Sequence, residues 1–114
     1  MIDSYSFGKM IINGKTFRKD LIILPDGTVL TPWQRKSGHR LELSDLEAVL
    51  DSQTKILVIG TGKPGLMRPH ATLVADLQEK GITAMVMSSQ QAAEKYNALA
   101  GGSDAVAACF HLTC

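Results

Sequence analysis

Three glycines, Gly60, Gly62 and Gly65, lie in the stretch GTGKPG with the G-x-G-x-x-G spacing of dinucleotide-binding loops. In such a loop the helix begins within the motif, and an acidic residue about 20 positions later holds the ribose. Here two prolines indicate an irregular loop with the helix beginning only near Arg68, and a pair of serines stands where the acidic residue is needed. The lysine and hydroxyl residue of a Walker loop do not follow Gly65 either. We therefore predict no nicotinamide, flavin or other cofactor.

The glycine turn nevertheless has a position that favours ligands. Parallel α/β sheets bind ligands outside the carboxyl ends of their strands. In this chain those ends carry residues 60–65, 88–89 and 111–114, and we expect the three stretches to converge. Basic side chains and two helix N-termini at this edge suit a phosphate, a carboxylate or an acidic peptide, and a plain structural turn is the alternative. The predicted anion site comprises Gly60, Thr61, Gly62, Lys63, Gly65, Arg68, Ser88 and Ser89.

Metal and nucleophile chemistry have weaker support. Cys109 and His111 would share one face of the last strand, and with His39 or His70 they could hold zinc. There is no CxxC or HExxH motif, so a buried cysteine and a hydrogen-bonded histidine are predicted instead of a metal site. There is also no GxSxG motif, and helix capping accounts for the serines at 88–89. No catalytic residue is predicted.

Trp33 is the single tryptophan, and Arg35 and His39 follow it closely. Packing in the core or at its rim is the simplest role for its ring. An exposed aromatic side chain can also anchor a protein partner, because buried aromatic rings dominate many interfaces. Trp33 and His39 are therefore a possible partner contact.

The composition is that of a folded globular domain, with 114 residues, 45% apolar and 20% charged. One domain over residues 1–114 is predicted. A net charge of +1 lacks the basic excess of a nucleic-acid binder. The apolar runs are far shorter than a membrane span, and no signal segment follows Met1, so we expect a soluble, cytoplasmic protein without membrane insertion. Two cysteines indicate a reducing compartment.

The first third of the chain is punctuated by residues that form hairpins. Asn13-Gly14 lies between the apolar residues 10–12 and 16–17, which predicts a two-residue β-turn. Residues 21–24 lead through a Pro-Asp-Gly turn into residues 28–30, which predicts a second antiparallel pair.

Helix boundaries are indicated by capping residues. Ser44 and Glu47 have the spacing of a capping box at the start of a short helix. Pro69 suits the first turn of a second helix. Ser88 and Gln91 form another capping box, which predicts a third helix.

These helices alternate with strands from Lys55 onward, namely residues 56–59, 82–87 and 105–112. Strand-helix-strand crossovers are almost always right-handed, so we expect three neighbouring parallel strands with both helices on one face. The antiparallel hairpins would cover the other face. The predicted fold is α/β, a three-layer β/β/α arrangement of N-terminal antiparallel hairpins packed on a parallel βαβαβ unit.

Several markers, in order, resemble the Mth938-type domain family. They are the early Asn-Gly hairpin, Trp33 followed by Gly38-His39, the strand end at residues 59–62 and the closing residues 111–114. The family includes the adipogenesis-associated Mth938 domain-containing protein of vertebrates and an assembly factor of mitochondrial respiratory complex I. The resemblance covers nearly the whole chain and implies a three-layer β/β/α domain related to swivelling α/β domains. It implies an assembly or interaction role, and a cleft lined by Gly60, Thr61 and Gly62.

Two functional hypotheses follow. The first is a non-enzymatic protein-binding or assembly module whose contact surface lies at the carboxyl edge of the parallel sheet and whose partner is another protein, with a homo-oligomer possible. The second is a small-ligand-binding protein or an enzyme that acts on an anionic substrate at the carboxyl edge of the parallel sheet. In that case Thr61, Lys63 and Arg68 would bind the anion, and His70 or His111 would serve as an acid or base.

Overall fold

The computed structural model describes residues 1–102 and 104–114. Strands dominate the amino-terminal third, and strands alternate with helices after residue 55. The elements in chain order are β1 (Ile2–Ser6), β2 (Lys9–Ile12), β3 (Lys15–Phe17), β4 (Leu21–Ile23), β5 (Val29–Leu30), β6 (Arg40–Leu41), the 3-10 turn η1 (Leu43–Leu46), α1 (Glu47–Leu50), β7 (Ile56–Gly60), β8 (Arg68–Pro69), α2 (Leu73–Glu79), β9 (Thr83–Met87), α3 (Ser89–Ala100) and β10 (Val106–Phe110).

A five-stranded mixed sheet is the centre of the fold, with the order β5-β4-β10-β7-β9. Strands β10, β7 and β9 are parallel neighbours, as predicted, and β4 pairs antiparallel with β10. The register places Leu21 opposite Phe110, so the residues just before β4 lie beside those just after β10. This pairing joins the first third of the chain to its carboxyl end.

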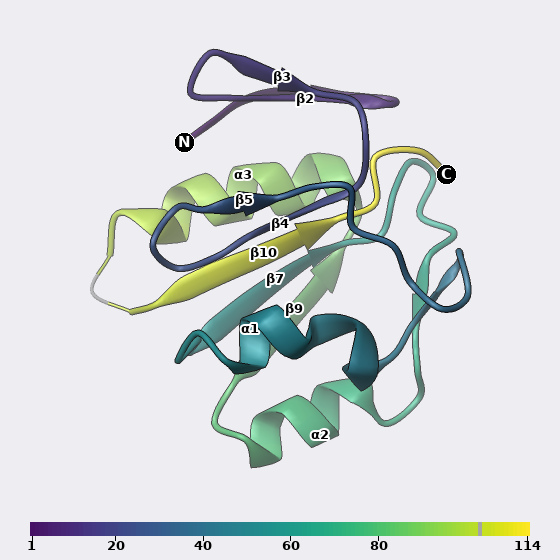
Figure 1. Cartoon of the computed structure of the whole chain (residues 1–114), viewed down its shortest axis with the longest axis vertical. Coiled ribbons are helices and arrows are strands. Elements are labelled where there is room, and N and C mark those ends of the chain that lie inside the picture. Colours follow the sequence, from purple (N-terminus) through teal and green to yellow (C-terminus); the bar gives the residue numbers. More distant parts are fainter. Residues whose placement is uncertain (103) are drawn as a thin grey trace.

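The helices cover both faces of this sheet, and the expectation that both would lie on one face is wrong. Figure 1 shows α1 in front of β9, with α2 below it, whereas α3 passes behind β5. The core divides in the same way: Leu73 and Leu77 of α2 pack in one cluster, and Ala92 and Tyr96 of α3 pack in the other. The cause is strand order. The chain passes from β7 through α2 to β9 on one side, and then from β9 through α3 back across β7 to β10 on the other. Because both crossovers are right-handed but run in opposite directions, their helices lie on opposite faces of the sheet.

The amino-terminal hairpins form as predicted. Asn13 and Gly14 both have positive φ, at 49° and 80°, and join β2 to β3 in a three-stranded antiparallel sheet, β1-β2-β3. This small sheet shares a face of the large sheet with α3. Asn97 of α3 bonds both the N–H and the carbonyl of Ile2, so the free edge of β1 is covered by the helix.

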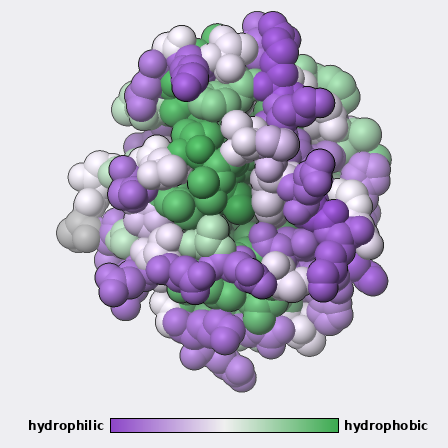
Figure 2. All heavy atoms as spheres, viewed as in Figure 1, coloured by the Kyte–Doolittle hydropathy of each residue, from purple (hydrophilic) through white to green (hydrophobic). Residues whose placement is uncertain are grey.

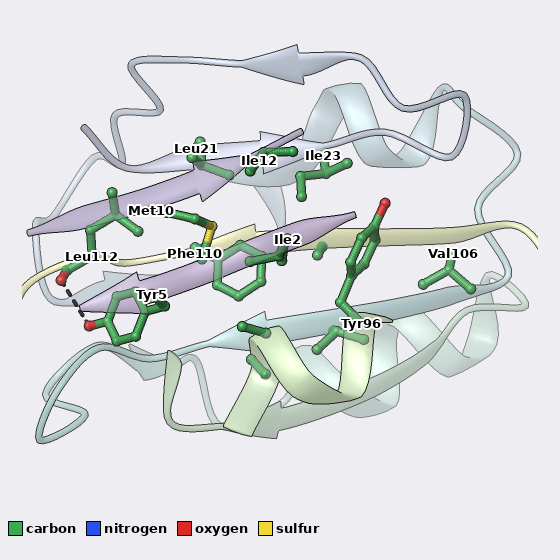
Figure 3. Packing of buried hydrophobic residues seen from close by; sticks show 14 residues of the cluster. Ile2, Tyr5, Met10, Ile12, Leu21, Ile23, Tyr96, Val106, Phe110 and Leu112 are labelled. Carbon is green, nitrogen blue, oxygen red and sulfur yellow. Dashed lines mark hydrogen bonds between the residues drawn. The ribbon is translucent and has the colours of Figure 1, made fainter. Parts of the chain in front are cut away.

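The core cluster between the small sheet, α3 and the large sheet is drawn in Figure 3. Alternation along the strands supplies its residues, because every second side chain of a strand points to the same face. Tyr5 is buried, and its hydroxyl donates a hydrogen bond of 2.9 Å to the carbonyl of Leu112 (Figure 3). That bond fixes the tail that follows β10 against the small sheet.

Two local predictions differ from the structure. The capping box of the first helix uses Glu42 and Asp45 rather than Ser44 and Glu47. Pro69 lies in β8, where Arg68–Pro69 pairs with Arg40–Leu41, and α2 begins later, at Leu73. The mixed α/β class with an antiparallel hairpin sheet is confirmed. Among the described residues, no helix has the length and apolar character needed to cross a membrane.

Candidate functional site

The three stretches at the carboxyl ends of the parallel strands converge, as predicted. The N–H of Lys63 donates to the carbonyl of Thr113 at 2.9 Å, and that of Leu66 donates to the carbonyl of Cys114 at 2.7 Å. The N–H of Ser89 donates to the carbonyl of Gly62 at 3.2 Å. The backbone groups of the glycine turn therefore bond to the tail and to the start of α3. In a dinucleotide-binding loop the same groups would point to phosphate.

Two of the three glycines are required by this close packing. A Cβ on Gly60 would lie 2.7 Å from the ring of Phe110. A Cβ on Gly62, whose φ is +106°, would overlap the carbonyl oxygen of Thr113 and lie 2.9 Å from Cδ2 of His111. Gly60, Thr61 and Gly62 are all buried. The glycine spacing is thus explained by contact with the chain's own tail.

The two adjacent serines have different roles. Ser88 is the N-cap of α3, and its hydroxyl accepts from the N–H of Gln91, as predicted. Ser89 is fully buried, and capping does not account for it. Its hydroxyl donates to the carbonyl of His111 at 2.6 Å and accepts from the N–H of Gly62 at 2.9 Å. Ser89 therefore links the glycine turn to the tail.

We expect Ser89→Ala to lower the free energy of unfolding by about 2 kcal/mol, because it leaves a buried N–H and a buried carbonyl without that partner. Ser88→Ala is the matched control and should cost at most about 1 kcal/mol, since it removes one long capping bond. Urea unfolding followed by circular dichroism measures both. Equal losses in the two variants would contradict the role assigned to Ser89.

A largely buried charged cluster of Asp20, Arg35 and His111 lies beside the turn. Oδ2 of Asp20 is 2.9 Å from Nη2 of Arg35 and 2.8 Å from Nδ1 of His111. Its Oδ1 accepts from the N–H of Leu112 at 2.8 Å. The Arg35 guanidinium also donates to the carbonyl of Gly38 and stacks on the Trp33 ring, 4.7 Å from the ring centre. The cluster therefore joins the segment before β4, the loop after β5 and the tail.

The electrostatics of the cluster are dominated by the carboxylate. Burial alone would raise the pKa of Asp20, but hydrogen bonds from His111, the Leu112 N–H and Arg35 outweigh it and hold the pKa below its usual value. We place a proton on Nδ1 of His111, because this nitrogen then donates to the carboxylate. The 3.1 Å approach of Arg35 Nη2 to the same nitrogen is then a contact between two donors rather than a hydrogen bond.

Two polar atoms of the cluster are buried without a hydrogen-bond partner in the described part of the chain, namely Nη1 of Arg35 and Nε2 of His111. The two side chains are only 4% and 8% exposed. The ring of His39 packs edge-on against that of His111, with centroids 5.5 Å apart. An imidazole held by a carboxylate, next to a guanidinium with one unpartnered nitrogen, is an arrangement that can bind an anion or move a proton.

Sequence reasoning missed Asp20 and Arg35. Neither residue belongs to a motif. Asp20 lies directly before β4, and this position indicates a site residue only once β4 is known to pair with β10. Trp33 was expected either in the core or as an exposed anchor. It is 8% exposed, and its indole N–H donates to the carbonyl of Asp45, so its role is packing. His39 is exposed.

The remaining predicted anion ligands are either bonded within the fold or exposed. The Thr61 hydroxyl donates to the carbonyl of Met87 at 3.1 Å. Lys63 and Arg68 are exposed, and the N–H of Arg68 donates to the carbonyl of His39 as part of the pairing of β8 with β6. His70 is exposed and lies 3.1 Å from the hydroxyl of Thr72. Helix α2 begins at Leu73 and not near Arg68, so its N-terminus lies beyond the glycine loop.

Both cysteines are free thiols. Cys109 is fully buried in the core cluster of the α2 face, and burial raises the pKa of its thiol. Among the described residues, no group of three or more His, Cys, Asp or Glu side chains could hold a metal ion. The zinc alternative through Cys109 and His111 therefore has no support in the geometry.

Cavities open away from the glycine turn. One of about 750 Å³ lies at the amino ends of the parallel strands, where Lys55, Lys80 and Asp104 line it. A groove of about 440 Å³ runs between β5 and α1, with Leu30 and Trp33 in its lining. Figure 2 shows apolar residues gathered in the middle of the face that carries α1 and α2, with hydrophilic residues on both sides.

Comparison with known proteins gives the same fold. A family model described as "Protein of unknown function (DUF498/DUF598)" matches residues 2–111. Conserved hypothetical protein PH1505 from Pyrococcus horikoshii OT3 is similar over 100% of this chain and 99% of its own, at 24% identity and a TM-score of 0.86. The protein MT938 is similar over 100% and 98%, at 25% identity and a TM-score of 0.84. A Bordetella pertussis protein, described as an Mth938-like domain, is similar over 98% of this chain and 85% of its own, at 19% identity and a TM-score of 0.72.

Proposed function

Since this chain belongs to the DUF498/DUF598 family of proteins of unknown function and has the Mth938-like fold that its resemblance implied, we propose from its own residues that it is a non-enzymatic protein-binding module. Its contact surface is the free edge of β9 rather than the carboxyl edge of the parallel sheet expected from the sequence, where the glycine turn bonds to the chain's own tail. The observation that carries this proposal is that β9 is an uncharged, five-residue strand at the edge of the sheet and pairs, among the described residues, with β7 alone.

The other edges of the three-stranded and five-stranded sheets are protected. The opposite edge of the large sheet, β5, has two residues, and Pro32 follows it closely. In the small sheet, β3 has three residues and is followed by Arg18 and Lys19, while α3 covers β1. Short length, charge and cover are the usual means of preventing strands from pairing with other chains. From residue 81 to residue 93, around β9, the sequence has no charged residue.

The backbone of β9 presents groups to a partner. The N–H of Thr83 donates to the carbonyl of Lys55, and the carbonyl of Met87 accepts from the N–H of Thr61, so residues 83, 85 and 87 bond toward β7. The backbone groups of Ala84 and Val86 therefore point outward. An extended segment that adds to a sheet edge gains its affinity from such groups.

Exposed apolar side chains accompany this edge. Val86 is 40% exposed and shares a face with Ala84, which packs toward the α2 side. On the opposite face, a cavity between β9 and α3 is lined by Met87 and Ala98 together with polar side chains. A partner strand could bury apolar surface on both faces while it pairs with β9.

The proposal is tested with a photo-crosslinking side chain at position 86 of the full chain, in its native cells. We expect a covalent adduct with a polypeptide, identified by mass spectrometry. The same probe at Leu66, which is 45% exposed at the carboxyl edge, is the control. An equal yield at both positions, or no adduct at position 86, would contradict a β9 contact surface.

A small anion bound by the charged cluster is the second candidate function. The unpartnered Nη1 of Arg35 favours it, whereas among the residues expected from the sequence the Thr61 hydroxyl already donates to the Met87 carbonyl and Lys63 is exposed. A thermal-shift titration with phosphate and acetate tests it, because a ligand of the folded state raises the melting temperature. A saturable rise that Arg35→Gln abolishes would favour this candidate.

A further inference from the structure

A basic surface lies on the two-stranded sheet β6-β8 and on the loops that lead into it, and we propose that it binds a carboxylate-rich polypeptide segment. The basic surface is defined by five exposed side chains, Lys36, His39, Arg40, Lys63 and Arg68. It lies on strands other than β9, so this binding is an addition to the proposed function and does not depend on it. Two observations carry it: the separation of charge along the chain and the register of the two arginines.

The two segments that form the basic surface carry charges of one sign. Residues 27–41 and 56–75 together contain five of the twelve Lys and Arg residues and none of the eleven Asp and Glu residues. Pairing of β6 with β8 joins these segments, and the loops that carry the two strands lie side by side at the right of the view in Figure 1. The fold therefore gathers positive charge that the net charge of +1 does not reveal.

The register of β6 and β8 sets two arginines side by side. Arg40 is the Cα partner of Arg68, and the N–H of Arg68 donates to the carbonyl of His39 at 2.7 Å. Residues in register on neighbouring strands share a face and lie about 4.8 Å apart. Among the described residues, neither guanidinium has a carboxylate within ion-pair distance. Since like charges opposite each other destabilise paired strands, this arrangement has a cost that an acidic partner would relieve.

The acidic residues that follow β6 are engaged in local structure. Glu42 and Asp45 form the capping box of η1. The two oxygens of the Asp45 carboxylate accept from the N–H groups of Lys36 and Glu42, at 3.2 and 2.9 Å. These carboxylates stabilise the turn after β6, so the paired arginines have no counter-ion from their own strand.

Backbone hydrogen bonds fix the loops that present the charges. The Arg35 guanidinium donates to the carbonyl of Gly38 at 2.7 Å, which closes the loop before β6. The N–H of Met67 donates to the carbonyl of Thr61 at 3.1 Å, which closes the loop that carries Lys63. A surface whose backbone is already ordered loses less conformational entropy when a partner binds.

The chemistry of the basic surface favours a polypeptide over a nucleic acid. A guanidinium donates two parallel hydrogen bonds to one carboxylate, which suits Asp and Glu side chains. Proteins that bind single-stranded nucleic acid also present aromatic rings on which the bases stack. Trp33 is the only Phe, Tyr or Trp in the two segments, and it is 8% exposed and covered by the Arg35 guanidinium. A segment with several acidic side chains would contact the paired arginines and a neighbouring lysine at the same time.

Binding is measured by fluorescence anisotropy of a labelled ten-residue glutamate peptide, titrated with the full chain. The salt concentration is about 0.1 M, where a Debye length of about 10 Å limits attraction to nearby charges. We expect saturable binding that Arg40→Gln/Arg68→Gln weakens about tenfold, which corresponds to about 1.4 kcal/mol. The matched control is Lys55→Gln/Lys80→Gln, which removes the same charge from exposed lysines at the amino ends of the parallel strands and should leave the affinity unchanged.

Two further measurements locate the contact. Arg68→Gln should not lower the urea midpoint, because it removes one of two opposed like charges, so weaker binding cannot be ascribed to unfolding. On addition of the peptide, amide shifts in NMR spectra should be confined to residues 36–40 and 63–70. No saturable binding, equal losses in the two double variants, shifts elsewhere, or tighter binding of a thymidine decanucleotide would overturn the proposal.

The test of the β9 edge is kept separate from this one. Leu66 lies between Lys63 and Arg68 in the chain, so a segment on the basic surface would also reach a crosslinking probe at this position. The comparison of positions 86 and 66 is therefore made in the Arg40→Gln/Arg68→Gln background. An adduct at position 86 in that background supports the proposed function whether or not the glutamate peptide binds.

Discussion

Asp20→Ala should lower the free energy of unfolding by about 3–5 kcal/mol, as measured by urea unfolding at pH 7. The carboxylate is bonded to both Arg35 and His111 and accepts from the Leu112 N–H. Its removal leaves the Arg35 guanidinium, whose side chain is 4% exposed, as an uncompensated buried charge. Breaking a buried pair by deleting one member has a cost of this order, because the remaining charge keeps its desolvation penalty.

Two controls separate this effect from the loss of any carboxylate. Asp51→Ala removes an exposed side chain and should change stability by less than about 0.5 kcal/mol. The double variant Asp20→Ala/Arg35→Met removes both charges and should lose less than the sum of the single changes, because no unpaired charge remains. A loss below about 1 kcal/mol in Asp20→Ala would mean that the cluster is not coupled to folding.

The same cluster predicts a dependence on pH. The pKa of Asp20 is lower in the folded protein than in the unfolded chain, where it is about 3.9. The stability that the carboxylate contributes is therefore present above pH 4 and is lost as the pH falls through the folded value. The difference in unfolding free energy between the natural chain and Asp20→Ala should accordingly shrink below pH 4.

The cluster illustrates which parts of the structure can be predicted from the sequence. The hairpin at Asn13-Gly14 and the N-cap at Ser88 were predicted, because the residues that determine them are adjacent in the chain. Asp20 and His111 lie 91 residues apart and meet because β4 pairs with β10. Local patterns contain no information on that pairing, so a lone aspartate before an apolar run gave no indication of a charged cluster.

The helix predictions failed where tertiary contacts decided between local alternatives. Ser44 and Glu47 had the spacing of a capping box, but Glu42 and Asp45, two positions earlier, form the box that the structure uses. Pro69 suited a helix start equally well, yet pairing with residues 40–41 draws it into a strand. Strand order likewise decided that the two long helices lie on opposite faces, and strand order cannot be read from the periodicity of single elements.

The glycine turn was located correctly by its sequence, but its purpose was not. Its spacing resembles a phosphate loop because both require backbone atoms to approach another group without an intervening Cβ. In this fold the other group is the chain's own tail at Thr113 and Cys114. Periodicity and spacing report that a close approach occurs, and they do not report what approaches.

Gly62→Ala should therefore destabilise the protein by about 3 kcal/mol or more in urea unfolding. Two costs combine: a non-glycine residue at a φ of +106° is strained by about 1–3 kcal/mol, and the added methyl group overlaps the carbonyl of Thr113. The tail has to move, so the N–H groups of Lys63 and Leu66 should lose their acceptors. Hydrogen exchange measured by NMR should show faster exchange at both amides.

Gly27→Ala provides a matched control for this prediction. Gly27 also has a positive φ, +91°, but an added Cβ would meet no atom within 4 Å. The variant should therefore have the backbone strain alone, about 1–2 kcal/mol, and leave exchange at Lys63 and Leu66 unchanged. If the two glycine variants lost equal stability, the packing of the tail on the turn would contribute nothing beyond strain.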